Sequence, residues 1–148
     1  MGQFTGAIDL EALPDGYHWK VINDFFYTTD AGEKLDIPAG LITDLASTPR
    51  IIWNILPPFG RYTGAAIVHD DLYATQKFTR ERSDAILLEA MEAEGVSWLT
   101  RYTIYWGVRI GGWTAWNEDA TKYAQQSYVK GGTTWQNQQI PPNRQASS

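Results

Sequence analysis

Apolar and polar positions alternate along the first third of the chain, which is the pattern of half-buried β-strands. Several short runs rich in β-branched and aromatic residues are separated by turn signals at Asp30-Ala31-Gly32 and Pro38-Ala39-Gly40. The predicted strands cover residues 17–22, 25–29, 34–37 and 41–46. We therefore expect a small antiparallel sheet, or a pair of hairpins, within residues 1–46.

The pattern changes to a helical period after this β part. Ser47-Thr48-Pro49 is typical of a helix start, and Thr79 is a good N-cap. Gly95 and the pair Gly111-Gly112 predict helix ends. The predicted helices cover residues 50–56, 61–74, 79–94 and 97–110, with a weaker helical signal over 117–128. The chain is thus predicted to be of the α+β class, with a bundle of about four helices over residues 47–128.

The domain organisation follows from these elements. One compact domain is expected over residues 1–130, because 148 residues suffice for a single core. Residues 131–148 are polar and rich in Gln and Pro, which predicts a C-terminal arm or a disordered tail.

Composition excludes several classes of protein. The net charge is −5 and no basic stripe is visible, so we expect no nucleic-acid partner. The absence of cysteine excludes a disulfide scaffold, a thiolate metal site and a cysteine nucleophile. No signal peptide is recognised, and no apolar run has the length of a transmembrane segment.

Two neighbouring predicted helices carry polar residues on otherwise apolar faces. On the first helix, His69 lies on the same face as Ala65, Ala66 and Tyr73. On the second, Asp84 heads an apolar stripe at helical spacing, and a buried carboxylate requires a partner. The short loop between the helices favours antiparallel packing, which brings Asp84 near His69 or Tyr73.

This set has two interpretations. A carboxylate bonded to one imidazole nitrogen fixes the tautomer and leaves the other nitrogen free as a base. The same Asp–His–Tyr network can instead serve only to hold two helices together. The helical wheel does not decide between them.

Longer motifs carry a resemblance to known families. The stretch IPAGLITDLASTPRIIWNILPPFGRYTGAAIVHDDLY, followed by RSDAILLEAMEAEGV and YWGVRIGGWTAW, resembles the phage and prophage family known as domain of unknown function 1353. This resemblance spans about residues 16–116. The segment His69-Asp70-Asp71-Leu72-Tyr73 is also similar to the HD-x-x-Y helix of phospholipase A2, in particular of its cysteine-free parvoviral version.

The phospholipase A2 resemblance implies a role for each residue of the site. His69 would be the base that activates water, Asp84 would orient His69, and Tyr73 would bond Asp84. Asp70 would help to bind calcium, the electrophile at the ester carbonyl.

The chain departs from that family where the calcium loop is expected. The matching stretch, Pro57-Pro58-Phe59-Gly60-Arg61, has two prolines and one glycine and is a poor cage of backbone carbonyls. Asp44 is a candidate substitute ligand. An Asx turn or cap ahead of the first predicted helix explains Asp44 equally well.

The fourth predicted helix adds arginines and aromatic residues. Arg101 and Arg109 are expected to stack on aromatics or to pair with a buried acid such as Asp84, and a solvated position is the better prediction for Arg101. Arg109 also lies where a cation favours the C-terminus of the predicted helix. Trp113 and Trp116 are expected to pack in the core.

Two functional hypotheses remain open. The first is a calcium- or water-dependent hydrolase of lipid or cell-envelope esters, acting in infection or lysis. The second is a non-catalytic virion component of the tail, neck or baseplate, or a host-takeover binding protein. The expected partners are other virion proteins or a lipid or envelope substrate. The expected location is the host cytoplasm after synthesis, with later packaging into the virion.

Overall fold

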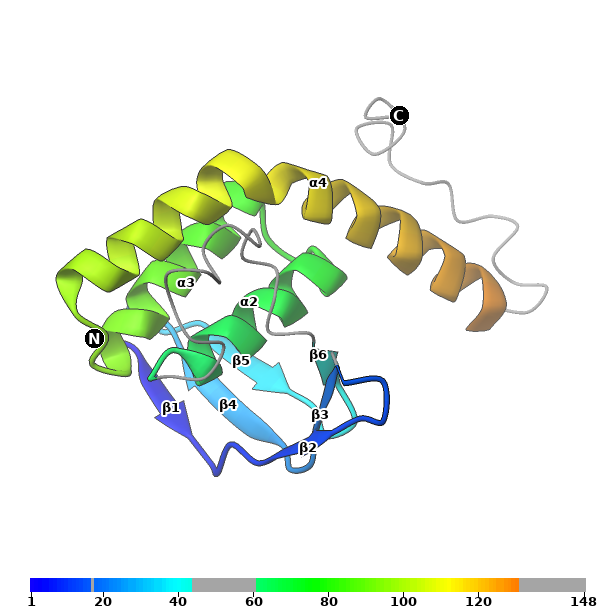
Figure 1. Cartoon of the computed structure of the whole chain (residues 1–148), viewed down its shortest axis with the longest axis horizontal. Helices are drawn as coiled ribbons and strands as arrows, with labels where there is room; N and C mark the ends of the chain where they lie inside the picture. Colours follow the sequence, from blue (N-terminus) through cyan, green and yellow to red (C-terminus); the bar gives the residue numbers. More distant parts are fainter. Residues whose placement is uncertain (17, 44–60, 131–148) are drawn as a thin grey trace.

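The computed structural model describes residues 1–16, 18–43 and 61–130, with side chains as far as residue 119. Two small antiparallel sheets lie on one side of a layer of helices (Figure 1). The α+β class predicted from the sequence is confirmed. The predicted helix at 50–56 and the polar arm at 131–148 lie outside the described residues, and a single domain over 1–130 stays a prediction.

The first sheet contains β1 (Gln3–Thr5), β4 (Phe25–Thr28) and β5 (Lys34–Ile37) in the order β1-β4-β5. Side chains along β4 and β5 alternate between the two faces of this sheet, and the face toward the helices is buried. Phe25 faces Ile37 and Tyr27 faces Leu35 across the β4–β5 pair, and all four side chains are buried. Their burial under the helices fixes the register, because a slip of one residue would turn them to the outside.

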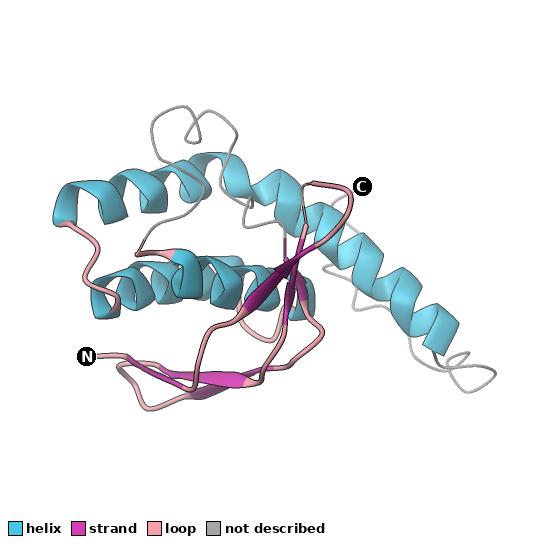
Figure 2. Ribbon diagram, turned by 60° about the horizontal axis from the view of Figure 1, so that its bottom comes forward, coloured by secondary structure: helices cyan, strands magenta, loops and turns pink. Residues whose placement is uncertain are grey.

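The second sheet contains β2 (Leu10–Ala12), β3 (Trp19–Val21) and β6 (Ile42–Thr43) in the order β2-β3-β6. Figure 2 shows the strands of both sheets, in magenta, on one side of the helices. The sequence predicted β3, β4, β5 and β6 approximately. It missed β1 and β2, which have three residues each and no long alternation.

Helices α2 (Thr63–Thr75) and α3 (Arg80–Ala93) begin and end close to the predicted residues. Thr79 caps α3 by accepting a hydrogen bond from the Arg82 amide, and Gly95 follows the helix with a φ of 79°.

The α2 N-terminus is capped from outside its own segment. Both carboxylate oxygens of Glu94, at the end of α3, accept hydrogen bonds of 2.9 Å from the amides of Gly64 and Ala65. These are amides that the helix itself leaves without a partner.

Helix α4 (Trp98–Lys130) contradicts the prediction that a helix ends at Gly111-Gly112. It runs unbroken through both glycines and continues past the other helices (Figure 1). The described residues therefore contain three helices rather than about four. The glycines reflect packing, because a Cβ built on Gly112 would lie 2.8 Å from the Tyr73 hydroxyl oxygen. Tertiary contact here outweighs the low helix propensity of glycine.

One hydrophobic core joins the strands to all three helices. It contains Val21, Phe25, Tyr27, Leu35, Ile37, Ile67, Val68, Leu72, Ile86, Leu87, Met91, Ile104 and Val108, among others. In the described part of the chain, no helix is long and apolar enough to cross a membrane.

Candidate active site

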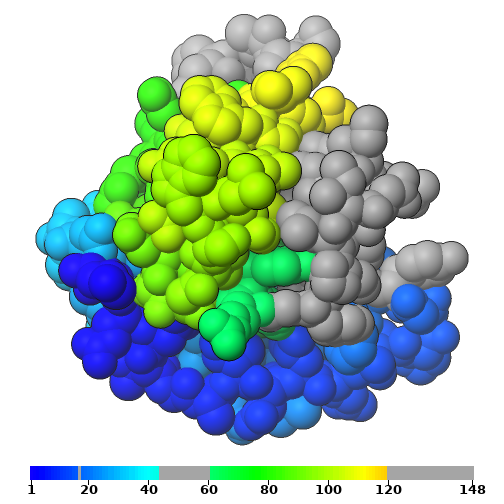
Figure 3. All heavy atoms as spheres, turned by 60° about the vertical axis from the view of Figure 1, so that its left-hand side comes forward, coloured from blue at the N-terminus to red at the C-terminus, as the bar shows by residue number. Residues whose placement is uncertain are grey.

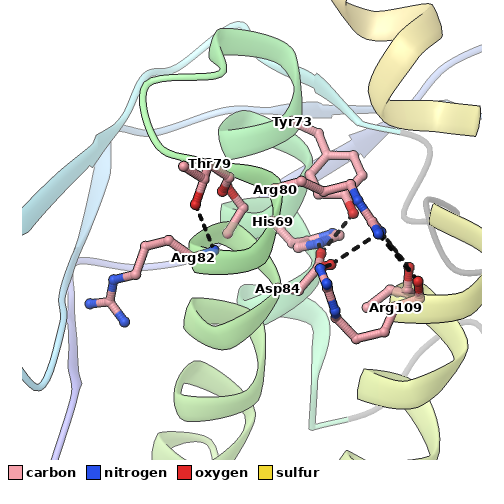
Figure 4. Close-up of polar contacts among 9 residues, drawn as sticks. His69, Tyr73, Thr79, Arg80, Arg82, Asp84 and Arg109 are labelled. Carbon is pink, nitrogen blue, oxygen red and sulfur yellow. Dashed lines mark hydrogen bonds and ion pairs between the residues drawn. The ribbon is translucent and has the colours of Figure 1, made fainter. Parts of the chain in front are cut away.

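The polar centre of the helix layer is Asp84 on α3, which is fully buried. Its Oδ1 atom lies 2.7 Å from His69 Nε2 and accepts a hydrogen bond of 2.7 Å from the Tyr73 hydroxyl (Figure 4). His69 is 2% exposed and Tyr73 is 0% exposed. The structure thus brings together the three residues that the sequence assigned to catalysis.

The helical period explains this meeting. His69 and Tyr73 are four residues apart on α2, so they lie one above the other on the same face. Their ring centroids are 4.2 Å apart. The short connection from α2 to α3 then places Asp84, in the second turn of α3, against both side chains.

Two arginines bind the other oxygen of the carboxylate. Asp84 Oδ2 lies 2.8 Å from Arg109 NH1, on α4, and 3.4 Å from Arg80 NH1, one turn earlier on α3. Arg80 also donates to the backbone carbonyls of Val108 and Arg109 on α4. The site is thereby tied to all three helices.

The sequence anticipated these arginines only in part. Pairing with a buried acid such as Asp84 was one of the roles considered for Arg109, and the structure confirms it. The expected place at a helix C-terminus is wrong, because α4 continues past Arg109 to Lys130. Arg80 was missed, although its i,i+4 spacing to Asp84 is a signal that sequence analysis can use. Arg101 is half-buried, and its NH2 atom lies 3.4 Å from Glu92 Oε1.

The electrostatics favour an ionised Asp84. Burial alone would raise the pKa of this carboxyl, but hydrogen bonds from His69, Tyr73 and Arg109 hold it below its ordinary value. Conversely, burial and the hydrogen bond to Asp84 raise the pKa of Tyr73, so its hydroxyl keeps its proton. The pKa of Arg109 is also raised, chiefly by its hydrogen bond to Asp84.

An ionised Asp84 determines the histidine tautomer. A carboxylate can only accept, so the proton of a neutral imidazole resides on Nε2. Among the described residues, none hydrogen-bonds the other ring nitrogen, Nδ1. Nδ1 therefore carries the lone pair that a general base requires.

Helix α4 closes one side of the site. Trp116 packs its ring edge-on against Tyr73, with centroids 5.0 Å apart, and Gly112 lies against the Tyr73 hydroxyl. The prediction that Trp116 packs inside is consistent with this contact. Trp113, in contrast, is 58% exposed, so the prediction of core packing is wrong for it.

The predicted calcium ligands do not form a set within the described residues. Asp70 is half-buried and accepts a hydrogen bond from the Thr43 hydroxyl on β6. The described part of the chain contains no group of three His, Cys, Asp or Glu side chains that could hold a metal ion. Asp44 and the stretch at 57–60 lie outside the described residues. A calcium site at Asp70 and Asp44 therefore stays a prediction.

These observations define an α+β protein whose three helices enclose a histidine–aspartate–tyrosine network held by two arginines. The chain belongs to the family described as Protein of unknown function (DUF1353), which it matches over residues 19–108. That range includes His69, Tyr73 and Asp84. No curated protein and no solved structure matches the chain.

Proposed function

We propose that this protein is an ester hydrolase of the phospholipase A2 type, encoded by a phage or prophage. It would act on lipid or cell-envelope esters during infection or lysis. The observation that carries the proposal is the pair of hydrogen bonds to Asp84 Oδ1. His69 and Tyr73 both bond this one oxygen from an HD-x-x-Y helix.

His69 supplies the chemistry in this proposal. Its Nδ1 takes a proton from the water molecule that attacks the ester carbonyl, and the imidazole becomes an imidazolium. The carboxylate of Asp84, 2.7 Å from Nε2, stabilises the charge that forms there. The proton then passes from Nδ1 to the leaving alcohol.

Tyr73 and the arginines act through Asp84. The Tyr73 hydroxyl and the guanidinium of Arg109 each hold one carboxylate oxygen, so the carboxylate cannot rotate away from the imidazole. Both are positioning residues, and neither needs to touch a substrate.

A requirement for calcium is a separate part of this proposal. When bound, it would polarise the ester carbonyl. Asp70 is the described residue whose carboxylate would hold it, together with Asp44. The remaining oxygens that calcium requires are not assigned to any residue.

The test is hydrolysis of phospholipid vesicles and of simple chromogenic esters by the purified full-length protein, with calcium and with a chelator. His69→Asn should abolish hydrolysis while circular dichroism shows the helix content of the wild type. His18→Asn is the matched control, because His18 is the other histidine and its side chain is 46% exposed. The control should retain full activity.

Calcium dependence is a separate arm of the experiment. If calcium takes part, Asp70→Asn should remove the stimulation by calcium but leave His69 in place. Wild-type protein that hydrolyses no ester under either condition would overturn the proposal. Full activity in His69→Asn would overturn it equally.

A second candidate function is favoured by the burial of the network. His69, Tyr73 and Asp84 are nearly or fully inaccessible, as expected if they only hold α2 and α3 together. The protein would then be a non-catalytic virion component or a host-takeover binding protein. Mass spectrometry of purified virions tests the virion role, which requires the protein to be present in the particle.

A further inference from the structure

The outer face of α4 carries a row of exposed apolar side chains. Leu99 is 70%, Trp106 is 57%, Ile110 is 78% and Trp113 is 58% exposed. Thr103, also exposed, lies between the first two. We call these five residues the outer seam. Figure 3 looks onto the end of the molecule where the first turns of α4 lie at the surface.

The spacing within the outer seam is regular. Successive members are four, three, four and three residues apart, so Leu99, Trp106 and Trp113 repeat every seven residues. The body of the protein covers the opposite face of α4, where Ile104, Val108 and Gly112 are buried. A helix needs only that inner face to pack on its own domain, so the outer seam requires another explanation.

A seven-residue repeat is the pattern of a helix that pairs with another helix. Alternation of four and three keeps apolar side chains in one line along a two-helix interface. The β-branched Thr103 and Ile110 occupy one set of positions and the larger Leu99, Trp106 and Trp113 the other. Ile110 and Leu99 are the residue types that favour two-stranded pairing at these positions.

We propose that the outer seam pairs with the outer seam of a second copy of this chain, so that two α4 helices form the core of a homodimer. The exposed area is sufficient. The two tryptophan side chains, each nearly 60% exposed, offer about 500–700 Å² per copy together with Leu99 and Ile110. Two copies would bury about 1,000–1,400 Å², within the range of small specific interfaces.

Charge favours a protein partner over a lipid surface. Helices that lie on anionic membranes carry many Lys and Arg residues on their polar face. From Trp98 to residue 119, α4 has two such residues, Arg101 and Arg109, and each lies beside an acidic side chain, Glu92 or Asp84. The whole chain is acidic, with a net charge of −5. The outer seam itself is uncharged and can face its own copy without repulsion.

The test is sedimentation velocity of the full-length protein over a wide range of concentration. Wild type should sediment with twice the mass of one chain. Trp106→Glu and Ile110→Lys each place a charge in the middle of the outer seam. Each should raise the dimer dissociation constant at least about thirtyfold, as expected for loss of a central interface residue.

Matched controls come from exposed apolar residues outside the outer seam. Trp98 is 65% exposed and lies on a different face of α4, and Ile42 is 48% exposed on β6. Trp98→Glu and Ile42→Lys introduce the same charges and should leave the dimer intact. Circular dichroism of all four variants should show unchanged helix content.

Other results would overturn the proposal. One is a wild-type protein that stays monomeric at every concentration. A second is a dimer that persists in both outer-seam variants. A third is a monomer that binds phosphatidylglycerol vesicles through Trp106, which would assign the outer seam to a membrane instead.

Discussion

Replacing the carboxylate of Asp84 by an amide is the most direct perturbation of the network. Asp84→Asn keeps the size of the side chain but removes its charge and one of its two acceptor oxygens. The new amide nitrogen can face Arg109 and Arg80, in which case donors face donors. Alternatively, it faces His69 and Tyr73, which also donate to Asp84 in the wild type. In both orientations two of the four contacts are lost and both guanidiniums lose their counter-charge.

The size of the effect follows from the burial of the group. Removing one partner of a buried ion pair costs about 3–5 kcal/mol, because the remaining charge is left uncompensated. The side chains of Arg80 and Arg109 are 22% and 23% exposed, so water relieves part of that cost. We expect Asp84→Asn to lower the free energy of unfolding by about 3 kcal/mol. For a domain of this size, the melting midpoint should fall by about 6–12 °C.

Urea unfolding followed by tryptophan fluorescence and circular dichroism measures this loss. Asp36→Asn is the control, because the side chain of Asp36 is 73% exposed and its contact with Lys34 is 4.0 Å long. The control should unfold like the wild type. A variant at Asp84 that stays within about 1 kcal/mol of wild type would show that the carboxylate does not anchor the helices.

Acid titration tests the same residue independently. The folded-state pKa of Asp84 lies below its unfolded value. Its contribution to stability is therefore present above the unfolded pKa and is lost as the pH falls through the folded pKa. Wild type should lose stability in acid more steeply than Asp84→Asn.

Further variants probe the surroundings of the network. Tyr73→Phe removes a hydrogen bond to a charged group and should lower the free energy of unfolding by about 1.5–3 kcal/mol in urea titrations. Gly112→Ala places a methyl group 2.8 Å from the Tyr73 hydroxyl and should destabilise the protein by about 1–2 kcal/mol. The exposed neighbour variant Gly111→Ala should instead stabilise it by up to about 1 kcal/mol. Burial raises the pKa of Glu94 from 4.5 to about 7, so its contribution is full below pH 4.5 and is lost as the pH rises to about 7. Glu94→Gln should therefore flatten the pH dependence of stability in that window, which unfolding at several pH values would reveal.

Much of the helical part could be predicted because residues at the helix ends themselves indicate where the helices begin and end. Thr79 is a capping residue and Gly95 has the positive φ of a helix end, and α3 lies between them. The C-terminal end of α4 was not predictable in this way. Gly112 resembles a stop signal, but its role is to admit the Tyr73 hydroxyl from another helix. Only the tertiary structure distinguishes these two uses of glycine.

The candidate site shows the same division between local and tertiary information. His69, Tyr73 and Asp84 could be predicted to meet because two helical periods and a short loop determine their placement. The charged residues of α3 give no local indication that Arg80 is the one that reaches into α4. Trp113 was misplaced because the predicted helix ended before it, so the sequence did not indicate that Trp113 lies on the outer face of α4.

The two oxygens of Asp84 separate the structural role of the network from its proposed chemical role. Oδ2 is bound by Arg80 and Arg109, which cross-link α3 and α4 and have no counterpart in the phospholipase resemblance. Oδ1 faces His69 and Tyr73, the residues that the resemblance does assign. If the network served packing alone, substitution of the residues that bind either oxygen would lower only the free energy of unfolding. If His69 is a base, its substitution removes hydrolysis at unchanged helix content, whereas changes at the arginines lower stability first. Measuring activity and unfolding on the same variants therefore distinguishes an active centre from a structural one. The cross-link between the helices depends on Oδ2, whereas the proposed chemistry depends on Oδ1.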